Sequence, residues 1–228
     1  MKISLGSGCL FFWHDKFCVD ATLKTLELIK DLDLDGFELH MHEQELLDEE
    51  FKKFKGKLDK YFVTFHMPAI TKSKEALNKL RAMISLLDIK QVVIHADEWA
   101  KLQEKPDDIP FVIENCDENK SGFQNLADVA EFNRHICVDI NHTEQTHPGK
   151  IPEQIKAAKS LIKEIHVSCL NNPLYPAKLD THHYLITGSN YKIPDCIPKD
   201  VVWVIEGVVP KDRLDLLEQE IALLRKLS

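Results

Sequence analysis

Eight short apolar segments recur along the chain, each four to six residues long and rich in Val, Ile and Phe. They cover residues 2–5, 36–40, 61–66, 91–95, 110–114, 136–140, 164–168 and 201–206. Most are nearly continuous apolar runs rather than alternations of apolar and polar residues. Such runs are typical of parallel strands that are covered on both faces.

Between these segments lie stretches with apolar residues at helical spacing. We expect helices over residues 21–32, 73–87, 123–133, 152–163 and 211–227. Strand and helix thus alternate, and eight such units in 228 residues predict an α/β protein with a (β/α)8 TIM barrel in one domain over residues 1–228. An open doubly wound sheet is the alternative, but Gly6-Ser7-Gly8 is too short a match to the dinucleotide-binding turn.

Composition narrows the class of protein. The chain is 44% hydrophobic and carries a net charge of −8, which excludes a disordered protein and argues against a surface devoted to nucleic acid. A local nucleic-acid groove stays open. The six cysteines include no C-x-x-C pair and predict reduced thiols, and no apolar run reaches 18 residues. We therefore expect a cytoplasmic protein with no membrane partner.

Metal-capable side chains stand at or just past the ends of six predicted strands. These are His66, His95, Glu114, Asp139, His166 and Glu206. His142 follows Asp139 by three residues in the next loop, and Asp180 and His182 lie in the long segment between the last two strands. In a barrel the carboxyl ends of the strands form one face, so all nine are expected to converge there.

A single buried histidine is usually a core residue, and a single acid is usually solvated. An acid that ends an apolar strand is different, because a buried carboxylate needs a cation or a donor. Nine candidates exceed the four ligands of one zinc ion and predict two or three ions, with Glu114 as a bridge. Mixed imidazole and carboxylate ligands suit Zn²⁺, with Mn²⁺ or Fe²⁺ as alternatives, and disfavour Mg²⁺ and Ca²⁺.

The ordered set Phe-His66, Val-Val-Ile-His95, Ile-Glu114-Asn, Cys-Val-Asp139-x-x-His142, Ile-His166, Asp180-x-His182 and Ile-Glu206 resembles a known family. It is similar to the endonuclease IV family of apurinic/apyrimidinic endonucleases, within the xylose-isomerase-like barrels. The resemblance implies three ligand sets. They are His66, His95 and Glu114; then Glu114, Asp139, His166 and Glu206; then His142, Asp180 and His182.

The same resemblance implies zinc-dependent hydrolysis of a phosphodiester, in abasic DNA or in a smaller phosphoester. Glu114 or Glu206 would act in catalysis by orienting the attacking hydroxide. Two features differ from that family. The loop after His66 reads Met-Pro-Ala-Ile and offers no aromatic wedge for DNA. The first loop offers Phe11 to His14 instead, which would serve either as a wedge or as a cover of the barrel rim.

Two other functions stay open. A sugar or sugar-phosphate isomerase or epimerase of the same superfamily would need one ion, held by Glu114, Asp139, His166 and Glu206, but has no evident need for the remaining ligands. A non-catalytic metal-binding barrel would usually lack a carboxylate ligand, and none is missing. We note Glu38, His14 and Asn115 as candidate substrate-binding residues, and His183 as a competitor of His182. The sequence predicts no oligomeric state.

Overall fold

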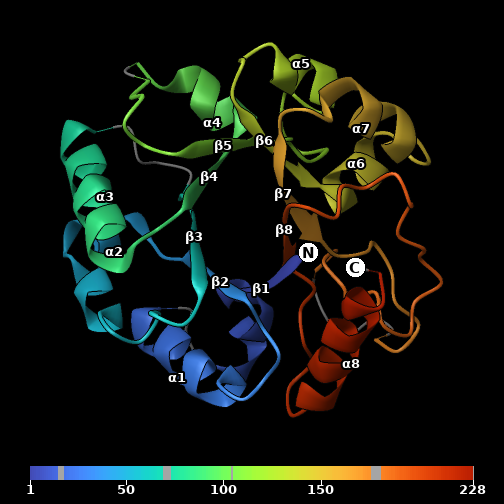
Figure 1. Ribbon diagram of the computed structural model, residues 1–228, viewed down its shortest axis with the longest axis horizontal. Coiled ribbons are helices and arrows are strands. Elements are labelled where there is room, and N and C mark those ends of the chain that lie inside the picture. The colour runs from blue at the N-terminus through green and yellow to red at the C-terminus, as the bar shows by residue number, and fades with distance from the viewer. Residues whose placement is uncertain (15–17, 69–72, 104, 176–180, 228) are drawn as a thin grey trace.

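Eight parallel strands close into a barrel, in the order in which they occur in the sequence (Figure 1). The computed structural model describes the whole chain except residues 15–17, 69–72, 104, 176–180 and 228. The strands are β1 (Lys2–Gly6), β2 (Gly36–His40), β3 (Phe62–His66), β4 (Gln91–His95), β5 (Phe111–Glu114), β6 (His135–Asp139), β7 (Ile162–Val167) and β8 (Val202–Ile205). The predicted (β/α)8 barrel is confirmed.

Helices surround the barrel on its outside (Figure 1). They are α1 (Val19–Ile29), α2 (Glu43–Leu47), α3 (Lys74–Leu87), α4 (Ala96–Lys101), α5 (Leu126–Ala130), α6 (Ile140–Thr146), α7 (Ile151–Ala158) and α8 (Leu214–Arg225), with 3-10 helices η1 (Ser7–Trp13) and η2 (Glu50–Phe54). The five expected helices are present, although α5 and α7 are shorter than their apolar spacing predicted.

The structure corrects two predicted boundaries. Ile140 is the first residue of α6 rather than the last of a strand, because the Asp139 side chain accepts a hydrogen bond from the His142 amide at 2.8 Å and starts a helix there. The expected helix over 152–163 stops at Ala158, because Leu161 already pairs with β6: its carbonyl accepts from the Ile136 amide at 2.9 Å.

Alternate residues of each strand face the helices or the inside of the barrel. Outward residues such as Ile94 and Ile165 belong to the main core under the helices, whereas Val93, Val112 and Cys137 form a separate small apolar cluster. The rest of the interior contains several polar residues. Ser4, Glu38, Thr64, Glu164 and His166 all have zero exposure.

The two ends of the chain meet where β1 pairs with β8, with Lys2 opposite Val202 and Leu5 opposite Ile205. The loop after β1 reinforces this closure, because the Trp13 indole donates to the Val209 carbonyl at 3.0 Å. Among the described residues, no helix is both long and apolar enough to cross a membrane.

Candidate metal centre

The parallel register brings the predicted ligands together at the carboxyl ends of the strands. His95 of β4 lies opposite Glu114 of β5, and Asp139 of β6 lies opposite His166 of β7. Glu206 follows the last residue of β8 directly. The mouth of the barrel therefore collects side chains that are far apart in the sequence.

Glu114 is the central carboxylate of this cluster, and its side chain is 1% exposed. Its Oε2 lies 3.0 Å from Nε2 of His66 and 3.0 Å from Nε2 of His95. Its Oε1 lies 3.0 Å from Nδ1 of His166. The three imidazoles thus divide between the two oxygens of one carboxylate, as expected of a carboxylate that bridges two ions.

The second ligand set also converges. Ligand atoms of Glu114, Asp139, His166 and Glu206 all lie within 4.8 Å of one another. His166 Nδ1 is 3.1 Å from Glu206 Oε1. One oxygen of Asp139 caps α6, while its Oδ2 is buried and has no hydrogen-bond partner among the described residues.

A third group contains His142, His182 and His183, which could also share one ion. His142 lies in the first turn of α6 and not in a loop. Its Nδ1 is 2.9 Å from the Asn115 carbonyl, so Nδ1 carries the proton and Nε2 is left as a ligand atom. His182 Nε2 is buried without a hydrogen-bond partner among the described residues. The predicted ligand Asp180 lies outside the described residues.

Two residues near these groups were not predicted as ligands. His183 joins the third group, and burial lowers its pKa to about 4, so its imidazole is neutral and able to bind a cation. His40 forms a further group with His66 and Glu206. The signal for His40 was present in the sequence, because β2 and β3 both end in histidine and these two residues pair in the sheet.

Behind His166 the barrel holds two buried carboxylates. Nε2 of His166 is 3.4 Å from Glu38 Oε2 and 3.7 Å from Glu164 Oε1, while Nδ1 points to the metal-ligand groups. Glu38 also accepts from Thr64 Oγ1 at 3.4 Å and lies 3.0 Å from His40 Nε2. Glu38 is therefore buried beneath the cluster, where it can orient His166 but is far from open solvent.

The other candidate substrate-binding residues have structural contacts. Asn115 is buried; its side chain accepts from the Asp139 amide at 2.9 Å and so fixes the end of β6. His14 Nε2 lies 3.1 Å from Thr25 Oγ1 on α1. Neither belongs to any of the ligand groups given above. In the first loop, Phe11 is 42% exposed, whereas the Trp13 indole is held against the chain after β8.

The charges of the cluster are compensated only by histidines. Within the described parts of the chain, each ion pair of Glu38, Glu114, Asp139 and Glu206 has an imidazole as its partner. Burial raises the pKa of Glu114, but His95 and His166 outweigh it and hold that pKa well below its usual range.

The histidines respond in the opposite direction. Burial lowers the pKa of His66, yet the hydrogen bond and charge of Glu114 outweigh burial and raise this pKa to about 9. Without a metal, His66 therefore keeps a proton at neutral pH that balances part of the charge of Glu114. A divalent cation would replace this proton, since metal ligands bind in their deprotonated forms.

The residues present fit a cluster of divalent ions. Asp139 Oδ2 and His182 Nε2 are buried without a hydrogen-bond partner among the described residues, and Asp139 Oδ2 lies 3.6 Å from His142 Nε2. The donor set of imidazoles and carboxylates suits Zn²⁺ and, less selectively, Mn²⁺ or Fe²⁺. The Asn115 carbonyl lies 2.9 Å from His142 Nδ1, and the Glu38 carboxylate lies 3.4 Å from His166 Nε2, so both imidazoles have outer polar neighbours of the kind that orient metal-binding histidines.

Comparisons with known proteins identify relatives in structure only. The sequence matches no protein-family model and no curated protein sequence. The fold is similar to that of SacUVDE, with a TM-score of 0.61 and 13% identity over 100% of this chain and 99% of that one.

Two further solved structures are similar. A xylose isomerase domain containing protein from Salmonella typhimurium LT2 gives a TM-score of 0.54 at 11% identity, over 99% of this chain and 96% of that chain. An uncharacterized protein from Parabacteroides distasonis ATCC 8503 gives 0.59 at 12% identity, over 100% of this chain and 99% of that chain. The chain therefore shares its (β/α)8 barrel fold with these three proteins.

Proposed function

We propose that this protein is a metal-dependent hydrolase of phosphoesters, similar in its mechanism to endonuclease IV and using two or three zinc ions. The observation that supports this most directly is the position of Glu114. It contacts His66, His95 and His166, each at 3.0 Å, and so belongs to two ligand groups at once. A bridging carboxylate between two metal sites is a common arrangement for phosphoester hydrolysis.

When bound, the ions would supply a hydroxide at neutral pH and neutralise the phosphoryl oxygens. The protein supplies the positions. A cavity of about 200 Å³ at the mouth is lined by Glu206, His40 and His183, together with Gly6 and Gly8. Glu206 is 13% exposed, so its carboxylate can orient the attacking water and accept its proton.

The same cavity limits what can enter. A volume of about 200 Å³ holds one phosphoryl group with part of a sugar, whereas whole drug-sized ligands fill about 300–1,000 Å³. An abasic site in DNA and a small sugar phosphate both satisfy this limit. Trp13 is tied to the Val209 carbonyl, whereas Phe11 is exposed and could contact DNA.

The experiment that tests the proposal combines metal analysis with a variant. The purified protein, loaded with zinc, should contain close to three ions per chain, or two if the third group stays empty. His95→Ala should lose about one ion and reduce phosphodiester hydrolysis at least a hundredfold. A nicking assay on an abasic duplex, beside a small phosphodiester, then separates the two substrate classes. If the zinc-loaded protein cleaves neither substrate, the proposal that it is a phosphoester hydrolase is rejected.

A single-metal isomerase or epimerase is the second candidate. Glu114, Asp139, His166 and Glu206 form a ligand group that is complete by itself, and one solved neighbour is described as a xylose isomerase domain containing protein. In that function the two glutamates would move a proton beside a carbonyl. His95→Ala would then leave the activity nearly unchanged, and one Mn²⁺ or Mg²⁺ per chain would suffice.

A further inference from the structure

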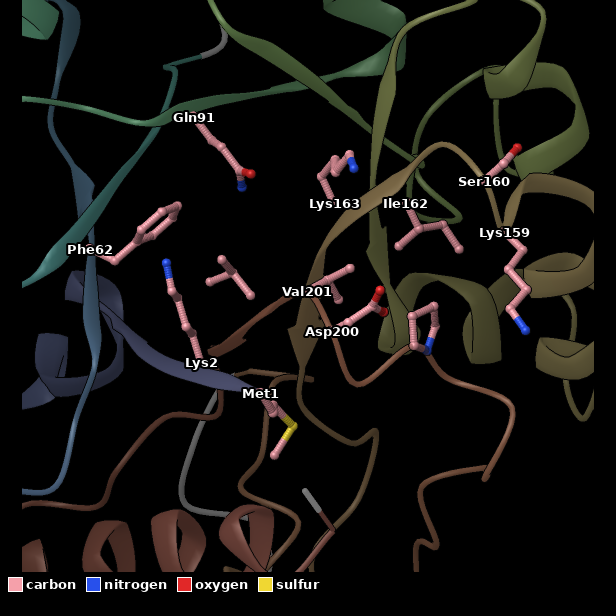
Figure 2. Close-up of a pocket in the computed structure, with 12 residues that line it drawn as sticks. Met1, Lys2, Phe62, Gln91, Lys159, Ser160, Ile162, Lys163, Asp200 and Val201 are labelled. Carbon is pink, nitrogen blue, oxygen red and sulfur yellow. The ribbon is translucent and has the colours of Figure 1, made fainter.

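The end of the barrel opposite the metal centre holds a large cavity. It has a volume of about 670 Å³ and is lined by residues at the amino ends of β1, β3, β4, β7 and β8 and in the turns before β7 and β8 (Figure 2). It shares no residue with the ligand groups at the mouth. A five-residue strand separates the two ends by about 13 Å, at 3.3 Å per residue. This is therefore a separate cavity.

The charge of this cavity is opposite to that of the protein. Lys2, Lys159 and Lys163 line it, against one carboxylate, Asp200. The chain as a whole has a net charge of −8. Among the described residues, no carboxylate lies within ion-pair distance of any of these three ammonium groups, although many other lysines of the chain are paired. The cavity thus offers unpaired positive charge in a concave site.

The walls supply a second kind of contact. Lys2 Nζ lies 4.0 Å from the centroid of the Phe62 ring, and Figure 2 shows the side chains of Lys2 and Gln91 extending inward from β1 and β4. Ile162 and Val202 add apolar surface, and Ser160 adds a hydroxyl. Cations beside an aromatic ring and an amide can bind a phosphate together with a ring system.

We propose that this cavity is a binding site for a phosphorylated small molecule of nucleotide size. Lys2 and Lys163 hold the phosphate, and Phe62 with its apolar neighbours contacts the organic part. Gln91 lies at the inner end of the cavity, where its amide donates to the buried Glu164 carboxylate and closes the floor. The volume falls within the range of sites that bind such molecules.

AMP is the probe for this site, and titration calorimetry on the metal-loaded protein measures its binding. Any affinity tag is placed at the C-terminus. We expect AMP to bind, adenosine to bind at least tenfold more weakly, and binding to weaken as salt is raised. Lys163→Glu and Lys2→Glu should each weaken AMP at least tenfold. Lys24→Glu is the matched control, because Lys24 is exposed on α1 outside the cavity and the charge change is the same.

Three outcomes would overturn the proposal. The first is that AMP does not bind at millimolar concentration. The second is that the wild type and both lysine variants bind AMP with equal affinity. The third is that AMP binding is lost when the metals are removed, which would place AMP at the mouth. Lys163→Gln, which removes the charge without reversing it, guards against misfolding of the Glu variants and should weaken AMP severalfold. Hydrolysis at the mouth is measured separately, so failure of one proposal leaves the other standing.

Discussion

Replacing the central carboxylate, Glu114→Gln, tests the electrostatic account of the cluster in the metal-free protein. The amide keeps the shape of the side chain but removes its charge. Against the effect of burial, Glu114, with a smaller contribution from the charge of Glu38, raises the pKa of His66 to about 9, from an ordinary value of 6.5. Because the folded protein holds this proton more tightly than the unfolded chain, the ion pair stabilises the fold by about 2.5 kcal/mol at pH 7.

The sign of the pH dependence follows from the same values. A group whose pKa is raised by folding stabilises the protein fully at pH values below its pKa in the unfolded chain, here 6.5. This stabilisation is lost as the pH rises through its pKa in the folded protein, here about 9. The deficit of Glu114→Gln relative to wild type should therefore be about 3 kcal/mol at pH 6 and less than about 0.5 kcal/mol at pH 9. Above pH 9 the uncompensated carboxylate of the wild type could make the variant the more stable protein.

Urea unfolding of chelator-treated protein, followed by the fluorescence of the buried Trp99 and Trp203, measures these differences between pH 6 and 10. Glu118→Gln, at an exposed position, serves as the control and should change stability by less than about 0.5 kcal/mol at every pH. A deficit of Glu114→Gln that is the same at pH 6 and pH 9 would refute the reasoning.

Other predictions concern the metals and the barrel itself. Glu38→Gln should lower the zinc affinity of the second ligand group about 10- to 100-fold, because it removes the carboxylate behind His166. Competition with a chromophoric chelator measures this affinity, and an unchanged value would contradict the role of Glu38. Zinc affinity should rise from pH 7 to pH 9, because zinc displaces the proton of His66, whose pKa Glu114 raises to about 9. Calorimetry in buffers of different ionisation enthalpy would detect the protons released. Gly36→Ala should destabilise the protein by about 2–3 kcal/mol in urea unfolding, since the added Cβ would lie 2.6 Å from the Phe62 carbonyl oxygen, and an effect below about 0.5 kcal/mol would show that the sheet adapts.

The strands could be predicted to within two residues because their apolar runs are buried. The short helices α4 and α6 were missed for a physical reason. Each begins directly at the end of a strand, and α6 reads Ile-Asn-His-Thr-Glu-Gln-Thr, with little apolar periodicity. Its start depends on the Asp139 side chain as a cap, and this cap was interpreted only as a metal ligand.

The candidate ligands could be predicted because histidines and acids end successive strands. The residues around them could not be predicted without knowing the register of the paired strands. Glu164 was placed at the amino end of a strand, as a surface residue would be. The structure begins β7 at Ile162 and turns Glu164 into the barrel beside His166. In the sequence, an interior polar residue such as Glu164 looks like a surface residue. A single sequence does not show whether its side chain faces the inside of the barrel or solvent.

The closure of the barrel by its two chain ends also determines when metals can act during folding. Glu206 reaches the mouth only after β8 has docked on β1, and the pairing of Lys2 with Val202 joins residues that lie 200 positions apart in the chain. Such long-range contacts form late and slowly. Ions held partly by Glu206 would therefore bind a barrel that is already closed, so they would slow its opening much more than they would speed its assembly. Stripping the metals would then shorten the lifetime of the folded barrel while leaving its refolding rate almost unchanged.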